Sequence, residues 1–155
     1  MTPEETLKKM EAYLRELEEA QRRGVRVGLP SDKVGSEVYG NVTLMQVGGM
    51  HEYGTVDMEQ RSFLRMPFEL KSADIDAFIQ KEYSKVLDGK STTVAALNSI
   101  GLYAANISKE AFRTNGFGQW PALSPITKAI KAKAGKSTPM VWTGLLRGSI
   151  TWSVD

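Results

Sequence analysis

The stretch from Thr92 to Thr114, TTVAALNSIGLYAANISKEAFRT, decides the fold class. Ser91 or Thr92 is a suitable N-cap, because a short hydroxyl side chain accepts a hydrogen bond from the first turn of a helix. Apolar and small residues then recur at helical spacing, which predicts the longest helix of the chain, ending near Thr114. Its expected buried face is made of Val94, Leu97, Ile100, Gly101, Ala104, Ala105, Ile107, Ser108 and Ala111. So wide an apolar face predicts a helix at the centre of the core.

The N-terminal residues predict a second long helix of a different character. Thr2 followed by Pro3 and Glu5 is a capping-box pattern, and Gly24 is a stop signal just after Arg23. Apolar residues recur at helical spacing within this range, and charged residues fill the rest of the surface; the apolar set is Leu7, Met10, Leu14 and Leu17. We expect residues 1–24 to form a charged helix that projects from the body and packs on a neighbouring subunit.

The rest of the chain, residues 25–155, is expected to form one domain. Patterning predicts helices over 42–52 with Asn41 as cap, 62–71, 74–87, 125–135, and 144–148 with Thr143 as cap, and a loop over 31–41. Val25–Leu29 and Ile150–Val154 alternate apolar and polar residues, which predicts two short strands that could pair. The predicted fold is a helix-rich α+β domain with a small antiparallel sheet and a long central helix.

Composition narrows the function classes. The 155 residues include no cysteine, which excludes disulfides and thiolate metal sites. The polar start MTPEETLKK does not resemble a signal peptide, and no apolar run reaches the length of a membrane helix, so we expect a cytoplasmic protein without a membrane partner.

The net charge of +2 is unevenly distributed. Residues 111–154 contain no acidic residue and six basic ones, Arg113, Lys128, Lys131, Lys133, Lys136 and Arg147. We interpret the four lysines as the solvated face of one helix. Contact with DNA or with an acidic partner is the alternative, because a one-signed segment attracts the opposite charge.

Catalytic and metal-binding patterns are weak. His51 is the only histidine, and the zinc-protease pattern His-Glu-x-x-His fails because position 55 is Thr. No serine lies in a Gly-x-Ser-x-Gly elbow, and no glycine-rich phosphate loop is present. We therefore predict no catalytic, metal or cofactor site. A small hydrolase built on His51 and Glu52 stays open as an alternative.

Four short stretches occur in a characteristic order. Met50-His51-Glu52-Tyr53-Gly54-Thr55 is followed by Arg61-Ser62-Phe63-Leu64-Arg65; then come WPALSPIT at residues 120–127 and WTGLLRGSI at residues 142–150. Together they resemble a family of small tailed-bacteriophage proteins, called virion morphogenesis, tail-component or tail completion proteins. The motif residues are His51, Glu52, Tyr53, Gly54, Thr55, Arg61, Phe63, Leu64, Trp120, Leu123, Ser124, Thr127, Thr143, Gly144, Leu146 and Ser149.

The resemblance implies a structural role. Members of that family complete the tail or neck and enable it to join the head, as homo-oligomeric rings without catalysis or cofactor. The implied partners are neighbouring neck and tail proteins, with possible non-specific contact to DNA in the channel. The implied location is the head–tail junction of the virion, and the host cytoplasm during assembly. A tail terminator or another neck subunit is the nearest alternative, and a DNA-binding accessory protein that uses the basic C-terminal third is the alternative from another class.

Overall fold

The long central helix α5 (Thr93–Arg113) organises the structure, a computed structural model that describes residues 1–30, 32, 35, 37–122, 125, 129 and 138–155. The Thr92 hydroxyl accepts a hydrogen bond from the Ala95 N–H and caps the helix, as predicted. Most of its predicted apolar face is buried, with Ala96 added to it. The exceptions are Val94, which is exposed because the neighbouring Thr93 takes the buried position of the first turn, and Ile107, which is half-buried.

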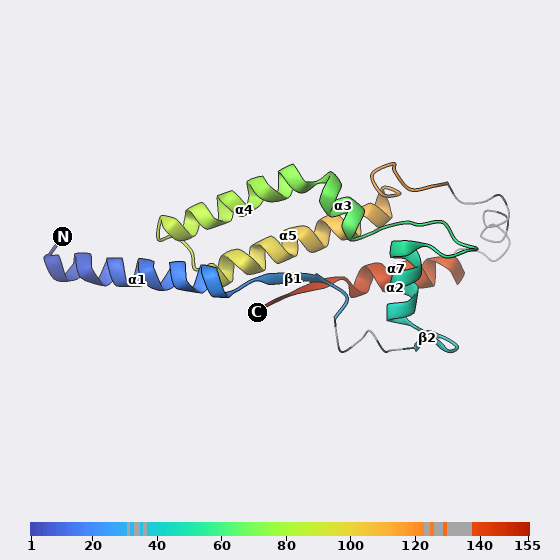
Figure 1. Ribbon diagram of the computed structural model, residues 1–155, viewed down its shortest axis with the longest axis horizontal. Coiled ribbons are helices and arrows are strands. Elements are labelled where there is room, and N and C mark those ends of the chain that lie inside the picture. The colour runs from blue at the N-terminus through green and yellow to red at the C-terminus, as the bar shows by residue number, and fades with distance from the viewer. Residues whose placement is uncertain (31, 33–34, 36, 123–124, 126–128, 130–137) are drawn as a thin grey trace.

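One helix and a two-stranded sheet pack on α5. Helix α4 (Ser72–Leu87) is followed by a turn at residues 88–90 and forms a hairpin with α5 (Figure 1). Strands β1 (Val25–Gly28) and β4 (Thr151–Val154) pair antiparallel, with Val25 opposite Val154 and Gly28 opposite Thr151, which confirms the predicted pairing. The Trp152 indole lies over Gly101 so closely that a Cβ there would overlap it. The helix-rich α+β fold is therefore as predicted.

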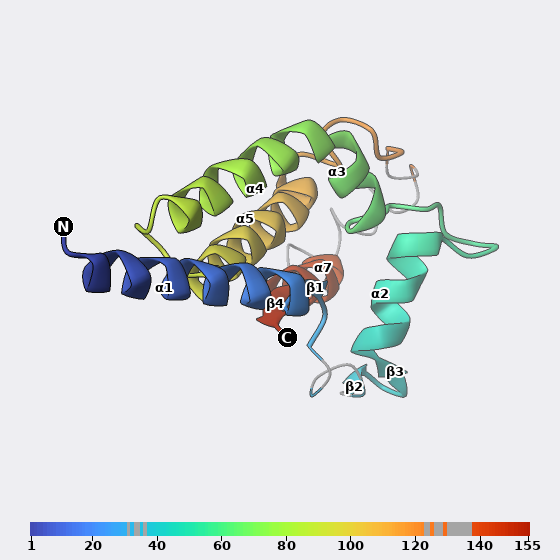
Figure 2. The ribbon, with the colours of Figure 1, turned by 60° about the vertical axis from the view of Figure 1, so that its left-hand side comes forward.

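Helix α1 (Pro3–Arg22) extends beyond the body at one end of the molecule (Figures 1 and 2). The predicted capping box is present, because the Thr2 hydroxyl accepts from the Glu5 N–H and the Glu5 carboxylate accepts from the Thr2 N–H. Its last turns are attached to the start of α5, where the Thr93 N–H donates to the Glu16 carboxylate at 2.6 Å. None of its residues is buried.

The other half of the molecule contains the shorter elements. Helices α2 (Leu44–Tyr53), α3 (Arg65–Leu70) and α7 (Thr138–Ser149) lie there with a hairpin of strands β2 (Glu37–Tyr39) and β3 (Val42–Thr43) (Figure 2). The buried hydrophobic cluster where they meet α5 consists of Leu44, Val47, Phe63, Ala105, Leu146 and Ile150.

Several predicted boundaries were wrong. The segment predicted as a loop over 31–41 contains β2. Thr43, and not Asn41, caps α2, because Thr43 and Gln46 form a reciprocal capping box, whereas Asn41 is followed by strand β3 and not by the helix.

Two further helices differ in length from the prediction. The helix predicted from Ser62 begins at Arg65, because Phe63 and Leu64 lie in a bend and direct their N–H groups to the Glu52 carboxylate. Helix α7 begins at Thr138, so Thr143 lies inside it; Pro139 suits a first helical turn and does not interrupt it. The helix predicted over 125–135 falls mostly outside the described residues.

The described part of the chain contains no helix with both the length and the apolar character needed to cross a bilayer.

Candidate functional site

The Glu52 carboxylate is the centre of the motif residues. It is buried at the end of α2 and accepts four hydrogen bonds. One oxygen, Oε1, accepts from the Ser62 hydroxyl at 2.8 Å and the Arg65 N–H at 3.0 Å. The other, Oε2, accepts from the Phe63 N–H at 2.9 Å and the Leu64 N–H at 3.0 Å. Both oxygens are thus occupied by the segment 62–65, which leads into α3.

This arrangement solves a specific problem of the segment 62–65. Its N–H groups precede and begin α3, where no intrahelical acceptor exists, and a buried N–H without a partner is costly. A carboxylate at a helix N-terminus also interacts favourably with the helix dipole. Two carbonyls of the same segment accept from side chains: Ser62 O accepts from the Trp120 indole N–H at 2.9 Å, and Phe63 O accepts from the Ser108 hydroxyl. Four distant parts of the sequence therefore meet here.

Gly54 redirects the chain between the first two motif stretches. Its φ of +75° is in the left-handed region, and a Cβ would lie 3.0 Å from the Gln60 N, so glycine is required on both counts. The loop over 55–60 returns at once, with the Gln60 side chain donating to Glu52 O at 2.9 Å and the Arg61 N–H donating to His51 O at 2.8 Å. The loop is thus short and exposed, and hydrogen bonds between residues 51–52 and 60–61 form its stem.

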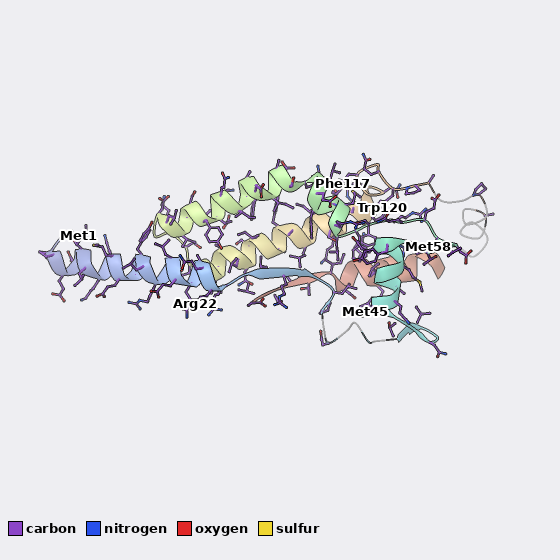
Figure 3. All side chains as sticks on the ribbon, viewed as in Figure 1. Met1, Arg22, Met45, Met58, Phe117 and Trp120 are labelled. Carbon is purple, nitrogen blue, oxygen red and sulfur yellow. The ribbon has the colours of Figure 1, made fainter. Side chains whose placement is uncertain are left out.

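Arg61 and Trp120 tie the segment after α5 to this stem. The Arg61 guanidinium donates to the carbonyls of Pro121 at 3.1 Å and Ala122 at 3.4 Å. The Trp120 ring packs edge-on against Phe112, which in turn packs against Phe63, each pair with ring centroids 5.4 Å apart. In Figure 3 Trp120 lies beside Phe117 near the end of α5. The third motif stretch is therefore joined to the second by hydrogen bonds and aromatic packing.

The fourth motif stretch contributes to the same core. Leu146 is fully buried in the cluster that contains Phe63, and Ser149 is also buried. Gly144 is exposed. Thr143 lies within α7. Leu123, Ser124 and Thr127 lie outside the described residues, as do all four lysines, Lys128, Lys131, Lys133 and Lys136, whose contact with DNA or an acidic partner stays a prediction.

His51 is half-buried on the inner side of α2. Burial, with a smaller contribution from the positive charge of Arg61, lowers the pKa of His51 below its ordinary value of 6.5. The neutral imidazole is therefore the favoured form in the fold. Both carboxylate oxygens of its neighbour Glu52 accept hydrogen bonds within the protein. The pair of His51 and Glu52 therefore offers no free carboxylate to a substrate or a metal. Across the described residues, no group of three His, Asp or Glu side chains is placed to hold a metal ion.

The exposed side of α2 is a second feature of the site. The exposed or half-buried residues of the outer face of α2 are all uncharged; these residues are Met45, Gln46, Gly49, Met50 and Tyr53. Tyr53, the one exposed aromatic residue of the first motif, lies under the Arg65 guanidinium at 5.9 Å from the ring centroid. An uncharged helix face with Met and Tyr, bordered by the Arg65 side chain of α3, has the composition of an interface core.

Sequence reasoning missed the partners of Glu52. Ser62 stood within a quoted motif but carried no role, and Gln60 and Ser108 were not singled out as polar partners. The exposed face of α2 was also missed, although its signal was present: the run LMQVGGM contains no charged residue.

Comparison with known proteins gives no match to a protein-family model, to a curated protein or to a solved structure.

Proposed function

We propose that the chain is a structural virion protein of a tailed phage or prophage, which completes the tail or neck and enables head–tail joining as a subunit of a ring. The observation that carries the proposal is that hydrogen bonds around Glu52 and the segment 62–65 join the described parts of the first three stretches, while Leu146 of the fourth packs in the same core as Phe63. Motifs that are used for internal hydrogen bonds and packing are what a scaffold requires, and the occupied Glu52 carboxylate argues against the hydrolase alternative.

The exposed surfaces also support a role in assembly. A ring subunit needs two different surfaces, one for each neighbour. The projecting α1 and the uncharged face of α2 are two such surfaces, and they lie in different halves of the molecule (Figure 1). Among the described residues, large apolar side chains are exposed on the first half of α1 and on the outer face of α2.

A deletion experiment tests the proposal. The coding region is removed from the phage or prophage that carries it, and lysates are examined by electron microscopy with and without the protein supplied from a plasmid. The proposal predicts separate filled heads and tails in the deletion, and joined particles after complementation. A matched plasmid that encodes His51→Ala should complement, since no chemistry is assigned to the imidazole. Normal infectious particles in the deletion would refute the proposal.

A further inference from the structure

The first half of α1 carries an apolar stripe that no other described residue covers. Leu7, Met10 and Leu14 are 57%, 58% and 56% exposed, and they follow one another at spacings of three and four residues on one side of the helix. The helix is 20 residues long, about 30 Å, and only its last turns touch the body, at Thr93. Such a stripe on a projecting helix requires a partner to exclude water from it.

The second surface is the uncharged face of α2. Met45 is 64% exposed and Tyr53 is 72% exposed. Between them Gly49 faces open space, with no atom within 4 Å of a Cβ built on it, so another helix can approach its backbone closely. The distance along α2 from Met45 to Tyr53 is about 12 Å, and that from Leu7 to Leu14 along α1 is about 10 Å, so the two surfaces match in length.

Charge decides which surface pairs with which. Glu4, Glu11 and Glu18 recur every seven residues along one edge of the α1 stripe, and among the described residues Glu11 and Glu18 form no ion pair. Arg65 borders the α2 face and pairs with no carboxylate of the described chain; it stacks on Tyr53 instead. The acidic edge of one surface therefore complements the cation beside the other.

If α1 paired with α1 of a second copy, the positions that face Glu4, Glu11 and Glu18 would supply no opposite charge. Antiparallel α1 helices would set this edge against the same edge of the second copy, and like charges in such positions are destabilising. Parallel helices would set it against Thr6 and Tyr13, which bring no cation. Asp57 and Glu59 lie on the loop after Tyr53, so the acidic edge must face the Arg65 side of α2 and not the loop.

We infer that the apolar stripe of α1 docks on the outer face of α2 in a second copy of the chain, with Glu11 beside Arg65 of that copy. Figure 3 shows Met1 and Met45 far apart along the long axis, so one subunit can use both surfaces at once. The contact is head-to-tail, and such contacts generate a closed ring or a filament. The contact rests on the exposed residues named above, and only its closure into a ring rests on the proposed function.

A mixing experiment with the full chain tests this contact. One variant carries Leu7→Gln, Met10→Gln and Leu14→Gln, which keep helix propensity and remove the stripe. The other carries Gly49→Gln and Tyr53→Gln, which obstruct the α2 face. Leu102→Gln, at an exposed apolar position of α5, is the matched control. Mass in solution is measured by light scattering after gel filtration, and circular dichroism checks folding.

The expected result is specific to a head-to-tail contact. The wild type and Leu102→Gln form oligomers, each surface variant alone is a monomer, and the two variants mixed form a one-to-one dimer that grows no further. If only the α1 variant loses assembly, α1 pairs with itself, and if only the α2 variant does, α2 pairs with itself. Either result overturns the inference, as does a monomeric wild type or assembly of both variants.

A charge exchange keeps the inference testable if a surface variant misfolds. Glu11→Arg and Arg65→Glu should each weaken assembly about tenfold or more, because each sets two like charges against one another across the contact. The double variant in one chain should restore assembly, because the exchanged pair again brings opposite charges together between neighbouring copies. A double variant as weak as the single ones would overturn the pairing. These measurements use the purified protein, so a failure here is distinct from a failure to find the protein in virions.

Discussion

Substituting Glu52 by Gln tests the hydrogen bonds that hold the segment 62–65, at which the first three motif stretches meet. The change keeps the shape of the side chain but replaces one carboxylate oxygen by an NH₂ group, which donates and cannot accept. The less costly orientation places this group at the Oε1 position, where the Ser62 hydroxyl can turn to accept from it. The Arg65 N–H then loses its acceptor, whereas the Phe63 and Leu64 N–H groups keep theirs.

The magnitude follows from that count. One N–H left without an acceptor costs about 1–3 kcal/mol, and three bonds reduced from charge-assisted to neutral cost about 0.5–1 kcal/mol each. Relief from burying a charge offsets part of this sum. We expect Glu52→Gln to lower the free energy of unfolding by about 3 kcal/mol.

Urea unfolding followed by circular dichroism measures the effect, with the slope of the transition checked for constancy. Glu59→Gln is the matched control, because Glu59 is an exposed acid on the neighbouring loop and should change stability by less than about 0.5 kcal/mol. A Glu52→Gln protein as stable as the control would refute the role given to this carboxylate.

Three further predictions concern a histidine, a glycine and the lysines. The pKa of His51 is lowered in the fold, so the unfolded chain binds the proton more readily. The contribution of His51 to stability is therefore complete above pH 6.5 and falls as the pH drops below it. The difference in urea midpoint between the wild type and His51→Gln should vary with pH in this window. A constant difference would contradict the buried neutral imidazole. Gly101→Ala should destabilise the protein by about 1–3 kcal/mol, because the new methyl overlaps the Trp152 indole and lies 2.8 Å from a Val25 methyl. Gly49→Ala, whose new methyl faces open space, should stabilise it by up to about 1 kcal/mol. Urea midpoints that move in the same direction for the two variants would refute this packing. Replacing Lys128, Lys131, Lys133 and Lys136 together by Gln should reduce the yield of joined particles without changing the circular dichroism, and unchanged infectivity would contradict a role for the basic segment.

Local signals predicted the elements that depend on local chemistry. Thr2, Pro3 and Glu5 together specify the start of α1, and Thr92 specifies the start of α5. Alternation in Val25–Leu29 and Ile150–Val154 predicted β1 and β4, and since only these two strands were expected, each could pair only with the other. These predictions hold because capping and periodicity involve residues a few positions apart.

Features that depend on distant partners were not predictable in the same way. The helix expected from Ser62 has good local propensity, but residues 62–64 are held outside the helix by hydrogen bonds to Glu52, ten or more positions earlier in the chain. The role of Glu52 itself depends on Trp120 and Ser108, which satisfy the opposite side of the same segment. A single sequence does not show which distant residues come into contact, so in the sequence alone Glu52 is notable only as the neighbour of a histidine.

The most direct test of the structural role is the location of the protein in particles. Antibodies raised against the purified chain are labelled with gold and applied to phage particles from the source culture, and the same particles are digested and analysed by mass spectrometry. A subunit of a neck or tail-completion ring should give label at the head–tail junction and peptides from the purified virion. Particles with neither label nor peptides would contradict the account, and the basic segment would then be tested for salt-dependent binding to DNA.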